Sequence, residues 1–302
     1  MGTRCDGCFL DERTFGVELE LGVVGHAPEE VASLLGVPYY EYNSEQHKDT
    51  SKGWKVVEDI TISCNESKAC FPMEIVSPVL AGAAGLAEVT SFVDSIPDQG
   101  YHVLNPTMGL HVHVGVQDLS LEQRKSVVAH VLFFEPGLDL LPPVRSDPKG
   151  GWCVSNWAHA RRPLGDVAAL LAGCSTLDCL VNLMHPKLAI EGQYFEPASM
   201  ALPVLGESGR YRYMKVSIMH LAERGRSTKP TVEFRAHVAS SDSVVVNKWA
   251  SLLVQLVDRA AKSPLPTAED FALSPREKLR RLFAMVNDAE LTAHYSKLLT
   301  IF

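Results

Sequence analysis

Residues 14–22, with the sequence TFGVELELG, alternate apolar and acidic side chains with a period of two. Successive side chains of an extended strand point to opposite faces, so Glu18 and Glu20 share one face while the apolar residues line the other. The two acidic positions lie roughly 6.6 Å apart along such a strand, and like charges at this distance repel each other. A strand tolerates the pair when the face is solvated or when a cation lies between the carboxylates. The pattern therefore predicts a strand with one apolar and one acidic face.

Two later segments repeat this alternation, GLHVHVG at residues 109–115 and TVEFRAHV at residues 231–238. Their alternate positions carry ionisable residues, which are His111, His113, Glu233, Arg235 and His237. A sheet face that is merely solvated more often presents Thr, Ser, Lys and Gln. Glu, His and Arg are instead the residue types that bind divalent metals and phosphate.

Two more segments contribute acidic candidates. WKVVEDITIS at residues 54–63 alternates and places Asp59 opposite Ile60, which predicts another strand. FPMEIVSP at residues 71–78 is also typical of a strand, and Glu74 is its only charge. Burying a lone glutamate among apolar residues is costly unless a positive group pairs with it. The alternative is an edge strand whose Glu74 faces water.

Helical patterns are interspersed with these strands. They cover residues 28–35, 83–96, 120–134, 166–171, 177–183, 243–262, 274–286 and 289–299. The first should stop at Gly36 and the third near Pro136, and the helices at residues 120–134 and 274–286 begin with capping-box patterns. A further strand is expected over residues 213–221. Because the strands alternate in polarity, the sheet should be antiparallel with helices packed on one face, an α+β arrangement. We expect an N-terminal arm at residues 1–13, one domain over residues 14–262, and C-terminal helices at residues 263–302 packed on the same domain.

Composition argues against two classes of protein, those that bind nucleic acids and those that span membranes. The chain has 302 residues with 46% hydrophobic residues and a net charge of -8, and it has no long basic block, which argues against nucleic-acid binding. No run approaches 18 apolar residues, so we expect no membrane span.

The chain has seven cysteines at irregular positions, which are Cys5, Cys8, Cys64, Cys70, Cys153, Cys174 and Cys179. An odd number without a secretory signal predicts free thiols in a reducing compartment, and therefore a cytoplasmic protein. The CxxC at its N-terminal end has no second CxxC and follows no predicted strand, so it is a weak indication of metal or redox chemistry.

Taken in order, these motifs resemble the amidoligase family. The motifs are ELE at residues 18–20, Trp54 with DIT at residues 59–61, EIVSP at residues 74–78, GLHVHVG at residues 109–115, PPVR at residues 142–145 and VEFR at residues 232–235. Each motif is weak alone, but six in order are fairly specific, and the likeness covers roughly residues 14–260. That family is similar to the glutamine synthetase and glutamate-cysteine ligase superfamily of carboxylate-amine ligases.

The resemblance implies a curved antiparallel sheet of the glutamine synthetase kind, with helices on its outer face and an open ionisable face as the active site. It implies ATP and Mg²⁺ as cofactors, with metal ligands at Glu18, Glu20, Glu74, His111 and Glu233. It implies ATP phosphate contacts at His113, Arg235 and Arg145, and catalytic roles for Arg235, Arg145 and Asp59. Ser217 stands where the family often has Asn, a departure that affects substrate contacts more than metal contacts.

The residue types suit the implied reaction. Transfer of the γ-phosphoryl group of ATP would convert a carboxylate into an acyl phosphate, which an amine then attacks to form an amide or isopeptide bond with release of ADP and phosphate. Imidazole suits Mn²⁺ better than Mg²⁺, so Mn²⁺ is an alternative ion. The substrates would be a carboxylate and an amine, each a small molecule or a peptide. A guanidino-kinase-like phosphoryl transferase, a metal-dependent hydrolase and a non-catalytic binding module are the other hypotheses.

Overall fold

The computed structural model describes residues 12–42, 44, 49, 51–62, 64, 70–96, 102–141, 153–157, 167–185, 214–221 and 230–299. The chain divides into two compact units, and each is described by itself. Unit 1 comprises residues 1–114 and 237–254, and unit 2 comprises residues 115–236 and 255–302. The predicted arm at residues 1–13 lies almost wholly outside the described residues, and the predicted domain boundaries stay predictions.

Unit 1 is built on a long central strand, β1 (Thr14–Val24), whose antiparallel neighbours are β4 (Cys70–Val76) and β7 (Gly109–Gly115). Its strands follow the order β2-β3-β4-β1-β7. The remaining strands of the unit are β2 (Tyr39–Tyr40), β3 (Lys55–Glu58), β5 (Leu80–Ala81) and β6 (His102–Val103). Only the short β2–β3 pair is parallel among the strand pairs described for this unit.

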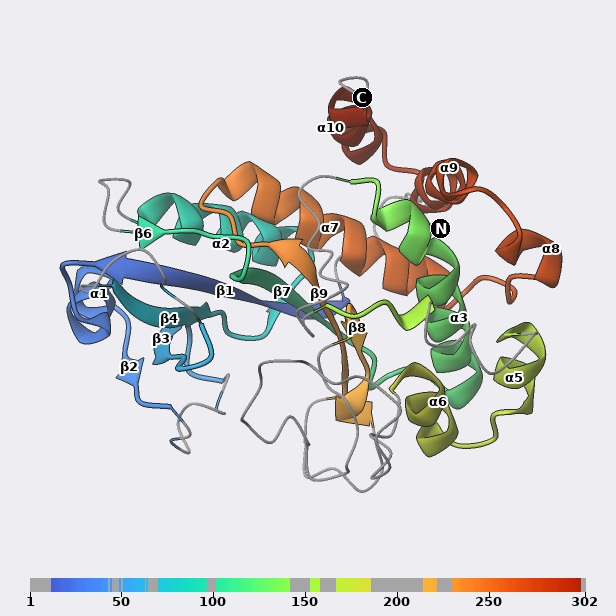
Figure 1. Ribbon diagram of the computed structural model, residues 1–302, viewed down its shortest axis with the longest axis horizontal. Helices are drawn as coiled ribbons and strands as arrows, with labels where there is room; N and C mark the ends of the chain where they lie inside the picture. The colour runs from blue at the N-terminus through green and yellow to red at the C-terminus, as the bar shows by residue number, and fades with distance from the viewer. Residues whose placement is uncertain are drawn as a thin grey trace, which may run out of the picture. The chain divides into compact units, whose positions relative to one another are not determined.

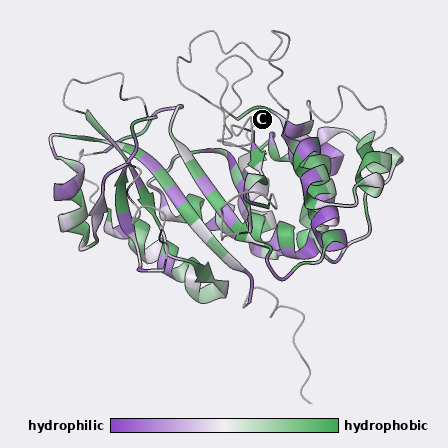
Figure 2. Cartoon of the chain, turned by 90° about the horizontal axis from the view of Figure 1, so that it is seen from below, coloured by the Kyte–Doolittle hydropathy of each residue, from purple (hydrophilic) through white to green (hydrophobic). Residues whose placement is uncertain are grey.

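The apolar face of β1 forms part of the core of unit 1. Phe15, Val17, Leu19 and Leu21 are all buried there, as their alternation predicts, and Figure 2 shows hydrophilic and hydrophobic residues alternating along the long strands. Helix α2 (Gly82–Ser95) packs closely on this face, because a Cβ atom added at Gly85 would lie 3.1 Å from Cε1 of Phe15. A side chain at that position would push the helix away from the strand.

Two other helices complete unit 1. Helix α1 (Pro28–Leu35) begins with a proline and ends at Gly36 in a left-handed conformation, as its sequence predicts. The part of helix α7 (Ser243–Ala260) that belongs to unit 1 lies beside α2 (Figure 1), where Asn247 donates hydrogen bonds to Leu86 O and Thr90 Oγ1. The helices therefore cover the apolar face and leave the acidic face of β1 for other contacts.

Unit 2 contains most of the helices and one short antiparallel strand pair, β8 (Val216–Ser217) with β9 (Thr231–Val238). Its other elements are α3 (Leu121–Leu138), α5 (Val167–Gly173), α6 (Leu177–Met184), the 3₁₀ turn η3 (Met219–Leu221), α8 (Ala268–Phe271), α9 (Pro275–Val286) and α10 (Ala289–Leu299). The predicted capping boxes that begin α3 and α9 are both present. The predicted fold class, α+β with a largely antiparallel sheet, is confirmed.

Two of three local predictions are wrong. The strand expected over residues 54–63 ends at Glu58, because Asp59 accepts hydrogen bonds from Thr61 and begins a turn. The strand expected over residues 213–221 is limited to Val216–Ser217 and is followed by the η3 turn. The helix expected to stop near Pro136 ends at Leu138, as predicted, with the proline inside its last turn.

The cysteine prediction is also wrong for four residues. Cys64 is bonded to Cys70, and Cys174 is bonded to Cys179. Cys153 is a free, buried thiol as predicted, whereas the N-terminal CxxC lies outside the described residues. Both disulfides close short loops, a pairing that irregular spacing does not reveal.

Across the described residues, none of the helices is both long and apolar enough to cross a lipid bilayer.

Candidate functional site

Strand pairing brings four predicted metal ligands of unit 1 together. Glu20 on β1 lies directly opposite Glu74 on β4, and Glu18 on β1 lies directly opposite His111 on β7. Side chains at directly opposite positions share a face and have Cβ atoms about 5 Å apart. Because β4 lies between β1 and β3, Glu74 is on an interior strand, and the alternative interpretation as a water-facing edge strand is wrong.

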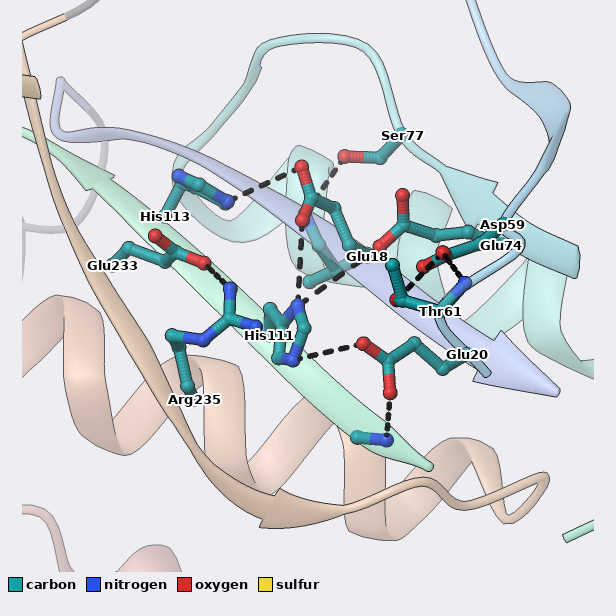
Figure 3. A network of polar contacts seen from close by, with 12 residues as sticks. Glu18, Glu20, Asp59, Thr61, Glu74, Ser77, His111, His113, Glu233 and Arg235 are labelled. Carbon is teal, nitrogen blue, oxygen red and sulfur yellow. Dashed lines mark hydrogen bonds and ion pairs between the residues drawn. The ribbon is translucent and has the colours of Figure 1, made fainter. Parts of the chain in front are cut away.

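The acidic side chains surround the imidazole ring of His111 (Figure 3). Its Nδ1 atom lies 3.5 Å from Glu18 Oε2 and 3.9 Å from Glu74 Oε1, and its Nε2 atom lies 3.3 Å from Glu20 Oε1. The neighbouring His113 extends the cluster, since its Nε2 atom lies 3.2 Å from Glu18 Oε1. The cluster of carboxylates and imidazole is therefore continuous on one face of β1, β4 and β7.

This cluster is largely removed from solvent. Relative exposure is 2% for His111, 6% for Glu20 and 9% for Glu74, while Glu18 is half-buried. Carboxylates crowded in such a place repel one another, and a cation that lies among them reduces this repulsion. Neither ring nitrogen of His111 makes a hydrogen bond with any described residue. Crowded carboxylates beside an imidazole ring are a ligand set that suits a divalent cation.

The geometry suits divalent cations. Glu18, Glu74 and His111 offer ligand atoms within 4.8 Å of one another, and so do Glu20, Asp59 and Glu74. A cation bound at about 2.1 Å separates its ligand atoms by about 3 to 4.2 Å, so small side-chain adjustments suffice. Carboxylate oxygens are preferred by Mg²⁺, and the imidazole nitrogen favours Mn²⁺. The residues present therefore fit the ions that the resemblance implies.

Asp59 reaches this cluster from a turn. Its Oδ1 atom accepts hydrogen bonds from Thr61 N at 2.8 Å and Thr61 Oγ1 at 2.7 Å, which fixes the carboxylate at the start of the turn. Glu20 is held at the other side of the cluster, where its Oε2 atom accepts a 2.6 Å hydrogen bond from Gly109 N. Backbone and hydroxyl donors thus orient two of the acidic groups of the cluster.

Two other predicted site residues lie on β9 in unit 2. Glu233 and Arg235 are both buried and form an ion pair with each other, and His220 Nε2 lies 3.7 Å from Glu233 Oε2. The roles predicted for them, as metal ligand and phosphate contact, stay predictions. Arg145 lies outside the described residues.

A buried polar network in unit 2 was not predicted from the sequence. Glu135 on α3 accepts hydrogen bonds from Ser155 Oγ and from Trp157 N, the latter at 3.0 Å. Close by, Lys215 Nζ donates to both carboxylate oxygens of Asp139 at 2.6 Å. Burial raises the pKa of Glu135 to about 7, although Lys215 and both hydrogen bonds lower it. An ionisable residue, Glu135, within the otherwise apolar segment LFFEPG was the feature of the sequence that could have indicated this network.

This network supports the strand that carries Arg235. Val154 O accepts a 2.8 Å hydrogen bond from Lys215 N, and Lys215 O accepts one of the same length from Arg235 N. In addition, Cys153 Sγ donates to Arg235 O at 3.1 Å. The backbone at Arg235 is therefore fixed through contacts that lead back to Glu135.

The comparison with family models agrees with the motifs. Residues 11–157, a little under half of the chain, match a model described as "Putative amidoligase enzyme". The resemblance to the amidoligase family is confirmed. All the residues of the unit 1 cluster lie within the matched region, whereas Glu233 and Arg235 lie beyond it.

One solved structure that is similar to the chain is described as "Crystal structure of novel glutamine synthase homolog". The two share 12% sequence identity with a TM-score of 0.41, over 95% of this chain and 64% of the other. This chain thus spans less than two thirds of the length of that protein. None of the curated proteins matches the chain.

Glu74 gives a test of the cation site. We expect Glu74→Gln to raise the melting temperature in EDTA by about 2 °C or more, because it removes a charge from a repelling cluster. Mn²⁺ at a hundred times its dissociation constant should stabilise the wild type by about 2.7 kcal/mol and the variant much less. Thermal unfolding with and without Mn²⁺ measures both effects.

Glu58→Gln is the matched control, because Glu58 pairs opposite Met73 and so lies on the other face of the sheet from Glu74. Its response to Mn²⁺ should equal that of the wild type. A Glu74→Gln variant that loses stability in EDTA and still responds fully to Mn²⁺ would contradict the assignment.

Glu135 gives a test of the unit 2 network. Its pKa is raised by burial from 4.5 to about 7, so the folded state binds the proton more tightly than the unfolded state. Its contribution to stability is therefore complete below about pH 4.5 and is lost as the pH rises through about 7. Glu135→Gln mimics the protonated form. The free energy of unfolding of the wild type, minus that of the variant, should fall by roughly 3 kcal/mol between pH 4.5 and pH 8 in denaturant titrations. If the free energies of unfolding of the wild type and of Glu135→Gln changed in parallel with pH, the assignment would be refuted.

Proposed function

We propose that this protein is an ATP-dependent ligase that joins a carboxylate to an amine through an acyl phosphate, releasing ADP and phosphate. The observation that carries the proposal is the buried cluster of Glu18, Glu20, Glu74 and His111 inside the region that matches the amidoligase model. The product is an amide or an isopeptide bond. A small-molecule or peptide carboxylate and a small-molecule or peptide amine are the proposed substrates.

Different residues of the cluster would hold different cations. Glu18, Glu74 and His111 would hold one divalent cation, and Glu20 and Asp59 would share Glu74 in holding a second. When bound, Mg²⁺ or Mn²⁺ neutralises the charge that spreads over the transferring phosphoryl group. The buried position of Glu20 and Glu74 keeps water away from these charges, which strengthens every electrostatic contact in the site.

The proposed contacts to ATP rest on other side chains. His113 touches Glu18 and is partly exposed, so it can reach a ligand on the open face of the sheet. We assign phosphate contacts to His113, Arg235 and Arg145, and a metal-ligand role to Glu233, on the resemblance to the family. Asp59 is proposed to act beside the acceptor amine through the cation that it shares with Glu20.

The proposal is tested by product analysis. Incubation of the protein with ATP, Mg²⁺ or Mn²⁺, and pools of acids and amines should release ADP and phosphate only when both substrate classes are present. With an acid labelled by ¹⁸O in its carboxylate, mass spectrometry should find one ¹⁸O atom in the released phosphate, because the acyl phosphate passes that oxygen to the phosphoryl group. Glu18→Gln should lower the rate at least about a hundredfold.

Other outcomes identify other chemistry. AMP release, or ADP release without ¹⁸O transfer, would contradict an acyl phosphate. A stable phosphorylated acceptor without an amide would indicate a phosphoryl transferase, and bond cleavage without nucleotide would indicate a metal-dependent hydrolase. Glu58→Gln again serves as the control and should retain the wild-type rate.

A further inference from the structure

The disulfide between Cys64 and Cys70 lies next to the proposed cation site. Cys70 is the first residue of β4 and lies opposite Val24, while Glu74 on the same strand lies opposite Glu20. Residues four apart on a strand point to the same face, so Cys70 and Glu74 share the ionisable face of the sheet. The Cα atoms of the two cysteines are 5.8 Å apart.

Gly22 provides the space that the disulfide occupies. It follows Glu18 and Glu20 on the same face of β1 by the alternation of the strand. A Cβ atom added at Gly22 would lie 2.5 Å from Cys70 Sγ and 2.6 Å from Cys64 Sγ, closer than atoms in contact can approach. The sulfur atoms therefore lie directly over β1, one position beyond Glu20 on that face.

Cys64 connects this point to the turn that carries Asp59. Among the described residues, the hydrogen bonds of Asp59 stay within its own turn: its carboxylate accepts from Thr61, and its backbone oxygen accepts from Ile62 N at 3.3 Å. The turn begins directly after β3, which holds its first residue, and the disulfide at Cys64 ties the chain beyond the turn to β4. The disulfide is a covalent link between the Asp59 turn and the strand of Glu74.

We propose that the Cys64–Cys70 disulfide is a redox latch that holds Asp59 beside Glu20 and Glu74, so that reduction releases the turn and weakens cation binding. This inference rests on the proposed function, because it takes the cluster as a cation site. Both cysteines are partly exposed, which gives a reductant access to the bond.

The chemistry of the latch is thiol–disulfide exchange with a dithiol. One thiolate of the dithiol attacks Cys64 or Cys70 and forms a mixed disulfide, and its second thiol then displaces the protein sulfur. Two electrons and two protons pass to the two cysteines, and the dithiol becomes a disulfide. Molecular oxygen or a disulfide oxidant reverses the step.

The test compares Mn²⁺ affinity in the two redox states. Protein reduced with dithiothreitol and desalted without oxygen should bind the Mn²⁺ ion that Asp59 shares with Glu20 and Glu74 about tenfold or more weakly than the oxidised protein does, as measured by isothermal titration and by the electron paramagnetic resonance signal of free Mn²⁺. Cys64→Ser with Cys70→Ser should bind weakly in both states. The matched control, Cys174→Ser with Cys179→Ser, removes the disulfide of unit 2 and should keep the full redox response.

A second variant shows whether the latch acts through Asp59. Oxidised Asp59→Asn should bind Mn²⁺ about as weakly as the reduced wild type, and its reduction should cause no further loss. If reduction lowered the Mn²⁺ affinity of Asp59→Asn as much as it lowered that of the wild type, the latch would be overturned. Tight and equal Mn²⁺ binding by both states of the wild type would overturn the latch alone, whereas no Mn²⁺ binding by either state would overturn the cation site as well.

Discussion

Negative charge gathered around His111 is the constraint on which the rest of unit 1 depends. Carboxylates of Glu18, Glu20 and Glu74 lie within 3.9 Å of its ring nitrogens, and a buried setting strengthens their mutual repulsion. Only a rigid frame keeps such groups together. The frame is β1 with paired strands on both sides, and burial of its opposite, apolar face against helix α2 offsets the cost of assembling the charges.

Much of this arrangement follows from alternation alone. A period of two in residues 14–22 and 109–115 determines which side chains share a face, and the structure confirms both strands. Alternation does not determine register, however, because any even shift keeps the same faces. The pairing of Glu20 with Glu74 and of Glu18 with His111 therefore had to come from the resemblance or from the structure.

Features that depend on distant or competing contacts could not be predicted from the sequence. Asp59 lies in a turn because its side chain accepts hydrogen bonds from Thr61. These hydrogen bonds compete with strand formation, and the alternation of the sequence gives no information about that competition. Glu135 meets its hydrogen-bond donors at residues that lie 20 and 22 positions further along the chain, and a short sequence period gives no information about such a contact. The disulfides were not predicted because an odd number of cysteines indicated free thiols. These misses concern what surrounds the cluster, whereas its own residues were predicted.

Coordination of a cation by His111 is the central claim, and the nitrogen ligand makes it directly measurable. Electron spin echo envelope modulation of the protein loaded with Mn²⁺ reports nitrogen atoms bonded to the ion. We predict modulation from a directly bound imidazole nitrogen, which changes to the ¹⁵N pattern when the protein contains ¹⁵N-labelled histidine. Stoichiometric Mn²⁺ bound by oxygen ligands alone, with no nitrogen modulation, would contradict this coordination.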